Sequence, residues 1–236
     1  MRCTMRGRVA LFVTLGLLYG RLATATPMGY TDRAAYDAAA SGLPGLNTLD
    51  FESLPTGVMG LGPIQGITFA FTIGGFDPKV VDDFDTTSPT HSLGTTGDGV
   101  FLAGDSFTMT FAPTQALGLF VIAADLISAG DFTLTVAGGS IFNSATTDSG
   151  FPPTLGDGGK VFFLGLVDPM ATFTTATFSS AGLPADFLFN IDDITGQIGA
   201  APQLAPVPEP ATLVLVASGL AAAFRLRSKR DHPRQA

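Results

Sequence analysis

Two adjacent aspartates, Asp192 and Asp193, could bind a metal ion. They follow the apolar residues 187–191, which we expect to form a β-strand, so strand alternation points one carboxylate inward and the other outward. An inward carboxylate must accept hydrogen bonds or bind a cation, because burying an unpaired charge is costly. Hard cations such as calcium prefer oxygen ligands of this kind. The alternative is that Asp192 caps a turn and Asp193 faces water.

A second acidic group, Asp82, Asp83 and Asp85, lies in a polar stretch rich in Thr, Ser and Gly. It lacks the spacing and the glutamate of an EF-hand calcium loop. We therefore favour a solvated acidic loop over a second metal site.

Residues that could act as nucleophile or base are few. His91 is the only histidine before the C-terminal tail, and its sequence neighbours include Ser88, Ser92 and Asp98. No G-x-S-x-G pattern surrounds a serine, and nothing indicates the buried carboxylate that orients a catalytic histidine. We therefore expect His91 to be a surface loop residue and the protein not to be an enzyme. A hydrolase that uses two of the many carboxylates is a less favoured alternative.

Charge is distributed unevenly along the chain. Residues 26–207 contain eighteen acidic and three basic residues, a net charge of −15, whereas the full chain carries −8. A body of this charge repels nucleic acid and anionic lipid, and it attracts divalent cations. Nucleic acid is therefore not an expected partner.

The N-terminus has the three parts of a secretory signal peptide: a basic start, an apolar run at residues 9–19 and an A-x-A cleavage site. We expect export by the Sec translocon and cleavage by signal peptidase after residue 25; the alternative is a retained anchor helix. Cleavage removes Cys3, the only cysteine, which excludes disulfides and thiolate metal sites in the mature chain. The signal residues are Arg2, Arg6 and Arg8 in the basic start and Ala23 and Ala25 at the cleavage site.

Residues 26–196 have the pattern of an all-β domain. Short apolar or alternating segments are separated by Gly, Pro, Asp and Ser, which favours an antiparallel sandwich. One short helix is expected at residues 33–40, capped by Thr31 or Asp32. Residues 82–98 and 144–159 are expected to be long loops, the first with a short strand around residues 91–93. The expected strands are residues 48–52, 67–73, 100–102, 106–111, 116–124, 132–137, 160–167, 172–179 and 187–191.

The C-terminus combines a rigid tripeptide, an apolar run and a basic end. Two prolines that flank a glutamate hold this part of the chain extended. As a helix, residues 211–224 would reach about 21 Å at ~1.5 Å each, and snorkelling arginines with local thinning would complete the span of a ~30 Å hydrocarbon core. We expect a transmembrane helix with a cytoplasmic basic end; the alternative is a terminal helix in the core. The residues are Pro208, Glu209 and Pro210 in the tripeptide and Arg225, Arg227, Lys229 and Arg230 in the basic end.

This order of three parts resembles the PEP-CTERM sorting signal of exported proteins from Gram-negative bacteria that make extracellular polysaccharide. The resemblance implies recognition by exosortase, a membrane cysteine protease that processes its substrates near the tripeptide. It also implies that the C-terminal helix anchors the protein transiently in the inner membrane, with the body in the periplasm. The processed protein would then reach the cell surface or the extracellular space.

The body resembles the jelly-roll β-sandwich domains of many PEP-CTERM proteins and, more distantly, jelly-roll carbohydrate-binding modules. The matching segments are residues 50–52, 163–165 and 189–194. In that superfamily a structural calcium often joins the first strand to the last. By position, Glu52 and Asp193, or Asp192 in its place, would match the calcium ligands.

Four segments follow from these patterns: a signal peptide (1–25), a β-sandwich domain (26–196), a linker (197–207) and a sorting signal (208–230). The expected function is that of an exported, non-enzymatic protein of the cell surface or of the extracellular matrix of a biofilm. The alternative is a module that binds exopolysaccharide. Against that alternative, the chain has no Trp, and its body has only Tyr30 and Tyr36, whereas sugar-stacking faces usually need such rings.

Overall fold

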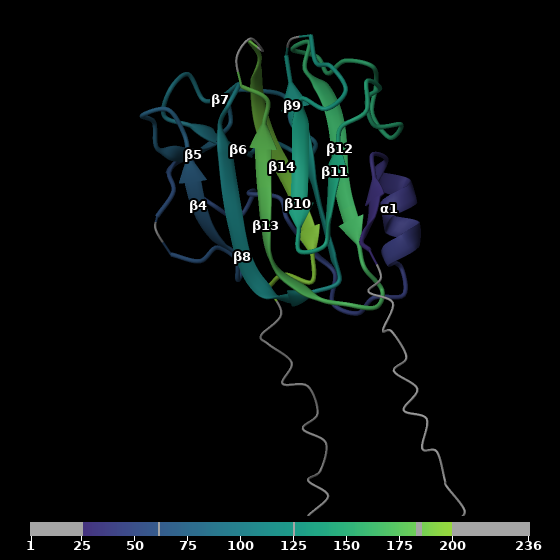
Figure 1. Ribbon diagram of the computed structural model, residues 1–236. Coiled ribbons are helices and arrows are strands. Elements are labelled where there is room, and N and C mark those ends of the chain that lie inside the picture. The colour runs from purple at the N-terminus through teal and green to yellow at the C-terminus, as the bar shows by residue number, and fades with distance from the viewer. Residues whose placement is uncertain (1–25, 61, 125, 183–185, 200–236) are drawn as a thin grey trace, which may run out of the picture.

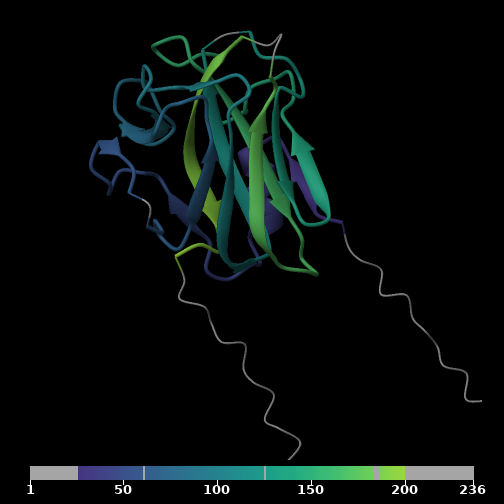
Figure 2. The same ribbon diagram turned by 60° about the vertical axis from the view of Figure 1, so that its left-hand side comes forward.

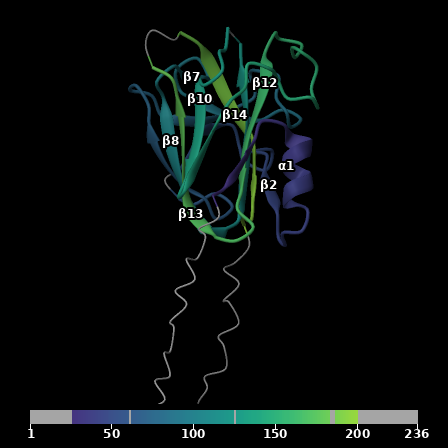
Figure 3. The ribbon, with the colours of Figure 1, turned by 45° about the vertical axis from the view of Figure 1, so that its right-hand side comes forward.

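Two antiparallel sheets pack face to face. The computed structural model describes residues 26–199, apart from residues 61, 125 and 183–185. Figure 3 shows the two sheets from the side, with the helix α1 (Arg33–Ala40) outside one of them. The expected all-β sandwich is confirmed.

The larger sheet has nine strands in the order β1-β12-β9-β14-β6-β5-β3, and β2 and β7 also pair with β14. Its strands are β1 (Met28–Tyr30), β2 (Asn47–Leu49), β3 (Gly57–Val58), β5 (Pro78–Val81), β6 (Ser92–Thr95), β7 (Phe101–Leu102), β9 (Ala116–Ala123), β12 (Lys160–Val167) and β14 (Leu188–Gly196). The smaller sheet has five strands in the order β11-β10-β13-β8-β4. Its strands are β4 (Thr68–Thr72), β8 (Ser106–Thr114), β10 (Phe132–Val136), β11 (Gly139–Phe142) and β13 (Phe173–Ser180).

The core between the sheets is rich in phenylalanine, because alternate residues of both sheets point inward. The ring centroid of Phe178 in β13 lies 5.2 Å from that of Phe107 in β8 and 5.7 Å from that of Phe189 in β14. All three side chains are buried. These contacts across the two layers hold the sandwich together.

The nine-stranded sheet has a second apolar layer on its outer face. There α1 places Tyr36 against Phe163, with ring centroids 5.2 Å apart. The helix fits closely because residue 165 is glycine: a Cβ at that position would lie 2.6 Å from atoms of both rings. Residues of β9 and β12 are therefore buried on both faces, which accounts for their continuous apolar sequences.

Several sequence predictions are confirmed in place and type. The helix has the expected bounds, Asp32 caps it by accepting a hydrogen bond from the N–H of Ala35, and Tyr36 and Ala40 are buried. Strand β12 begins and ends as predicted, and β4, β7, β8, β9, β10, β13 and β14 overlap their predicted ranges. Residues 144–159 contain no strand, as expected.

Other predictions are wrong. Residues 50–52 were expected to continue a strand, but β2 ends at Leu49 and Phe51 has a left-handed backbone with φ 60°. By contrast, the loop at residues 82–98 does contain the short strand that was expected around residues 91–93: it is β6, which extends to Thr95. The sequence patterns also missed β1, β3, β5 and β11. These four strands have two to four residues each and depend on a neighbouring strand for their hydrogen bonds, so their sequences carry little periodicity.

The two ends of the described chain lie at the same end of the sandwich. Met28 pairs with Val167, and Val167 pairs with Ala116 at the start of β9. Gly196 pairs with Leu117, the next residue of β9, so both chain ends lie at the same end of the strands. Figures 1 and 3 show this end at the bottom. The loops that connect β9 to β10, β11 to β12 and β13 to β14 lie at the opposite end, at the top of Figure 2.

The signal peptide, the proline tripeptide, the C-terminal transmembrane helix and its basic end lie outside the described residues. Within the described ranges, the eight-residue α1 is the one helix present, and no helix there has the length and apolar character needed to cross a membrane.

Candidate functional site

The hydroxyl of Ser88 lies among oxygen atoms from three separate segments. Its Oγ is 3.1 Å from Glu52 Oε1, 3.1 Å from the carbonyl oxygen of Asp50 and 3.0 Å from that of His91. It is also 3.2 and 2.9 Å from the two carboxylate oxygens of Asp192. One hydroxyl can donate a single hydrogen bond, so most of these close contacts lack a proton between the two oxygens. We call this group of five residues the Ser88 cluster.

Glu52 is held by hydrogen bonds from one turn of the chain. Its Oε1 accepts from the N–H groups of Thr90 and His91, at 2.8 and 2.6 Å, and its Oε2 accepts from the Thr90 hydroxyl. Burial alone would raise the pKa of Glu52, but these donors favour the ionised form more strongly and lower its pKa to about 2. Glu52 therefore carries its negative charge across the ordinary pH range.

Asp192 is buried, but on the outer face of the nine-stranded sheet: it pairs with Phe120 of the outer apolar layer, and Ile191 points into the core instead. Asp193 is half-buried. A register shift in β14 directly after Asp192, with Asp193 at φ 47°, turns the two side chains apart. Burial first, and then the negative charge of Asp193, raise the pKa of Asp192 to about 7, although donors on Thr87 and Ser88 oppose the rise. Burial also raises the pKa of Asp193.

The structure thus brings two of the three predicted metal ligands together. Glu52 and Asp192 both contact the Ser88 hydroxyl, and the carbonyl oxygens of Asp50 and His91 complete a set of ligands suited to a hard cation. The hydrogen bonds of the Ser88 hydroxyl do not include Asp193. Among the residues described, no three acidic, histidine or cysteine side chains form a metal-binding group, so the carbonyls are an essential part of this set.

His91 is half-buried rather than free on the surface, and its Nδ1 lies 3.2 Å from the carbonyl oxygen of Phe51. Ser88 contacts the main chain of His91 and not its imidazole ring. The sequence proximity of these two residues therefore does not produce a nucleophile and base in hydrogen-bonding contact.

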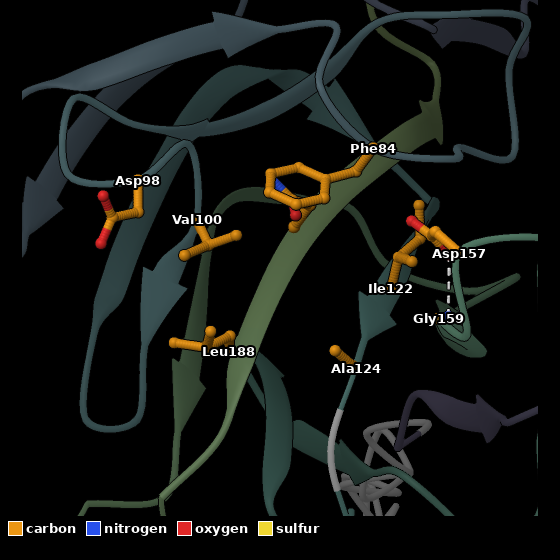
Figure 4. Close-up of a pocket in the computed structure, with 9 residues that line it drawn as sticks. Phe84, Asp98, Val100, Ile122, Ala124, Asp157, Gly159 and Leu188 are labelled. Atoms are coloured by element: carbon orange, nitrogen blue, oxygen red, sulfur yellow. Dashed lines mark hydrogen bonds between the residues drawn. The ribbon is translucent and has the colours of Figure 1, made fainter.

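A pocket of about 160 Å³ lies on the outer face of the nine-stranded sheet, near its loop end. Figure 4 shows the ring of Phe84 between Val100 and Ile122, with Leu188 and Ala124 on the other side of the hollow. The polar residues that line it are Asp98, Asp157 and Asn190. Apolar walls with few polar groups are typical of small-molecule sites.

Asn190 points an amide group into this pocket from β14. The side chain is 4% exposed, and its Nδ2 lies 2.8 Å from the carbonyl oxygen of Gly99 and 3.5 Å from that of Leu93. Because both partners are acceptors, the amide orientation is fixed with Nδ2 toward them. The Oδ1 then faces the pocket and accepts no hydrogen bond from the described residues.

The outer face of the five-stranded sheet is lined by hydroxyl groups, in rows that cross the strands. One row runs Ala70, Thr108, Thr177, Thr135 and Ser140. The Oγ1 atoms of Thr108 and Thr177 are 3.1 Å apart, and those of Thr135 and Ser140 are 2.9 Å apart. None of the five strands contains a charged residue. The other hydroxyl residues of this face are Thr68, Thr72, Ser106, Thr110, Thr133, Thr175 and Ser179.

Sequence reasoning missed both the pocket and the hydroxyl face. The pocket joins Phe84, Ile122 and Asn190, which are distant in sequence and form no local motif. The hydroxyl face did have a signal: in residues 106–111 and 132–137, threonine or serine alternates with the core residues that were used to predict the strands. Residues on the solvent side of a strand can be read from the same period of two.

Comparison with known families identifies the C-terminal segment. Residues 206–230 match the PEP-CTERM protein-sorting motif, which confirms the resemblance found from the tripeptide, the apolar run and the basic end. The motif marks an exported protein that exosortase processes. No curated protein matches the chain.

Proposed function

We propose that this protein is a non-enzymatic component of the cell surface or extracellular matrix, delivered there by its C-terminal sorting signal. The observation that carries this proposal is the position of the PEP-CTERM motif at residues 206–230, directly after a folded sandwich that ends near residue 199. The signal peptide, the Sec translocon and a transient anchor in the inner membrane complete the route. The sandwich, with jelly-roll connections, is the delivered cargo.

The positions of the two chain ends indicate how the sandwich would be oriented at the membrane. Residues 26 and 199 both lie near the end of the sandwich where β9 begins and β14 ends. While residues 211–224 anchor the chain, that end faces the inner membrane. The loop end, with the pocket, then faces away from the membrane and is free to meet other molecules.

Substituting the tripeptide tests the sorting role. A chain with Pro208→Ala and Pro210→Ala should export normally but stay unprocessed in the inner-membrane fraction, because exosortase no longer recognises it. Pro202→Ala, a linker proline outside the matched residues, is the control and should be processed as the unsubstituted chain is. Equal processing of both variants would refute the sorting role of the tripeptide.

We also propose that calcium binds in the Ser88 cluster. Glu52 and Asp192, with the carbonyl groups of Asp50 and His91, would hold the ion, and Asp193 would add negative charge nearby. The crowding of oxygens around Ser88 Oγ supports this, since a cation would offset repulsion that a single hydroxyl proton cannot. The bound ion would join the segment after β2 to the last strand.

A second candidate function is binding of a neutral exopolysaccharide, and the hydroxyl face favours it. The body carries −15 between residues 26 and 207, yet the strands that form this face carry no charge. Neutral hydroxyl groups can donate to and accept from sugar hydroxyls over a broad surface. The lack of tryptophan matters less for contacts of this type than for ring stacking.

The test is co-sedimentation with insoluble neutral polysaccharide. Thr108→Val with Thr177→Val keeps the β-branched shape and removes one pair of hydroxyls. If the face binds sugar, the double variant should be retained at least threefold less than the unsubstituted protein. Thr154→Val, in the loop after β11, is the control and should be retained normally. Equal retention of both variants would exclude the hydroxyl face as the binding surface.

A further inference from the structure

We propose that the pocket lined by Phe84, Ile122 and Asn190 binds a primary ammonium group carried on a short alkyl chain. This site goes beyond the sorting, calcium and polysaccharide proposals, and it shares no residue with them. It rests on three observations: the apolar walls, the unpartnered oxygen of Asn190 and the excess of carboxylates at the mouth.

The apolar walls suit an alkyl chain. Phe84, Val100, Ile122 and Leu188 surround the hollow, and Phe84 offers a ring face to which a cation is attracted. The volume of about 160 Å³ corresponds to roughly five water molecules at ~30 Å³ each, so it fits a chain of about five or six heavy atoms. A lysine side chain or a small free amine has this size.

The polar groups of the pocket are acceptors. Asn190 is 4% exposed, and its Oδ1 accepts no hydrogen bond from the described residues, so it is free to accept one from a ligand that donates. The carboxylates of Asp98 and Asp157 add negative charge at the rim. Ammonium has three donors and no acceptor, and it matches this set better than a neutral alcohol does.

The two lysines near the pocket do not neutralise its carboxylates. Lys79 lies 3.9 Å from Asp83, which is outside the pocket lining. Lys160 has the same strand parity as the inward residues Phe162 and Leu164, so it points away from the outer face. Among the described residues, Asp157 accepts from the backbone N–H groups of Asp85 and Gly159 and forms no ion pair with a lysine or arginine.

Isothermal titration of the full-length chain in detergent micelles, with a blank titration of empty micelles, tests the proposal. The probe is n-pentylammonium and the neutral comparison is n-pentanol. We expect saturable binding of the ammonium, at least tenfold tighter than that of the alcohol and weakened by added salt. Acetyl-lysine methylamide is a second probe: binding equal to that of pentylammonium identifies a partner's lysine side chain as the natural source, and weaker binding identifies a free amine.

Two variants at exposed positions keep the test independent of folding. Ala124→Leu fills the hollow and should weaken binding at least tenfold, and Asp98→Asn should weaken it about threefold. Asparagine tolerates the left-handed backbone of residue 98, where φ is 53°. Asp37→Asn, on α1 outside the pocket, is the matched charge control and should bind normally. Equal affinity for alcohol and ammonium, absence of saturation, or full binding by Ala124→Leu would overturn the proposal.

Discussion

The outer faces of the two sheets differ in how they are covered. On the nine-stranded sheet, α1 and the loop of residues 144–159 bury a second apolar layer, and the Ser88 cluster and the pocket lie at its open parts. On the five-stranded sheet, the outer face is bare and lined by threonine and serine. The outer face of the nine-stranded sheet therefore carries a packed apolar layer and the candidate sites. The outer face of the five-stranded sheet is free to serve as a contact surface.

The largest effect is expected where both sheets meet. Phe178→Ala removes a buried ring that contacts Phe107, Phe132 and Phe189, and it should lower the free energy of unfolding by about 3–5 kcal/mol. Thr177→Val, the next residue on the bare face, should change it by less than about 0.5 kcal/mol. Urea denaturation measures both. Similar losses in the two variants would contradict the division between core and bare face.

Calcium removal should have the next largest effect. If the Ser88 cluster binds the ion, calcium at 100 times its Kd adds about 2.7 kcal/mol to the stability, and excess EDTA removes this and lowers Tm. Glu52→Gln should abolish the response to EDTA. Asp168→Asn alters a buried carboxylate that caps a turn elsewhere, so it should lower Tm but keep the response. An unsubstituted protein whose Tm is indifferent to EDTA from pH 6 to 8 has no calcium in this cluster.

The covered face should resist any added volume. Gly165→Ala places a methyl group 2.6 Å from atoms of Phe163 and Tyr36, and the overpacking should cost about 1–3 kcal/mol. Gly42→Ala is the control, because no atom lies within 4 Å of the added carbon. Comparable stability of the two variants would mean that α1 does not pack closely on β12.

The pH dependence of folding stability should distinguish Asp192 from Glu52, the two carboxylates of the Ser88 cluster. Without calcium, the raised pKa of Asp192, about 7, favours folding at low pH, and this contribution is lost as pH rises from about 4 to 7. Asp193, whose pKa is also raised, acts in the same direction. Glu52, with its pKa lowered to about 2, has the opposite effect in a different window, because its contribution is lost as pH falls from about 4.5 to 2.

Unfolding in EDTA at several pH values checks this. The stability of the unsubstituted protein should fall by up to about 1 kcal/mol per pH unit between pH 4 and 7. Asp192→Asn should be less stable throughout, because it loses an acceptor, but its slope should be smaller. Glu52→Gln serves as the control and should keep the slope in this window. Equal slopes in all three proteins would exclude Asp192 as the titrating group.

The sequence predicted the parts of the fold that have their own periodicity. The alternation around Phe107 and Phe132 and the apolar runs of β9 and β12 depend on local pattern, and these strands are found where expected. Strands such as β3 and β11 depend on pairing with a partner. The alternation in β13 is weaker because a register shift between Phe173 and Thr175 interrupts it.

The candidate site was predictable in part for the same reason. Strand alternation predicted that one of the adjacent aspartates is buried, and Asp192 is, but it lies on the outer face of the sheet and accepts hydrogen bonds from the N–H groups of Thr87 and Ser88. The sequence did not indicate Ser88, because its role depends on a loop that folds back on β14 across more than a hundred residues. The pocket is formed wholly by residues that are distant in sequence, so no local pattern of residue types predicts it.

Substitutions in the hydroxyl rows should have the smallest effect on stability. They therefore give the clearest contrast with substitutions on the covered face. Thr108→Val with Thr177→Val replaces both partners of an exposed hydrogen bond with side chains of similar shape. Removing both partners leaves no unsatisfied group, and valine suits a strand, so the free energy of unfolding should change by less than about 0.5 kcal/mol. Urea denaturation of this double variant beside Gly165→Ala tests the claim. A loss above about 1 kcal/mol would mean that the hydroxyl rows stabilise the sheet, and the bare face would then need no partner to explain its composition.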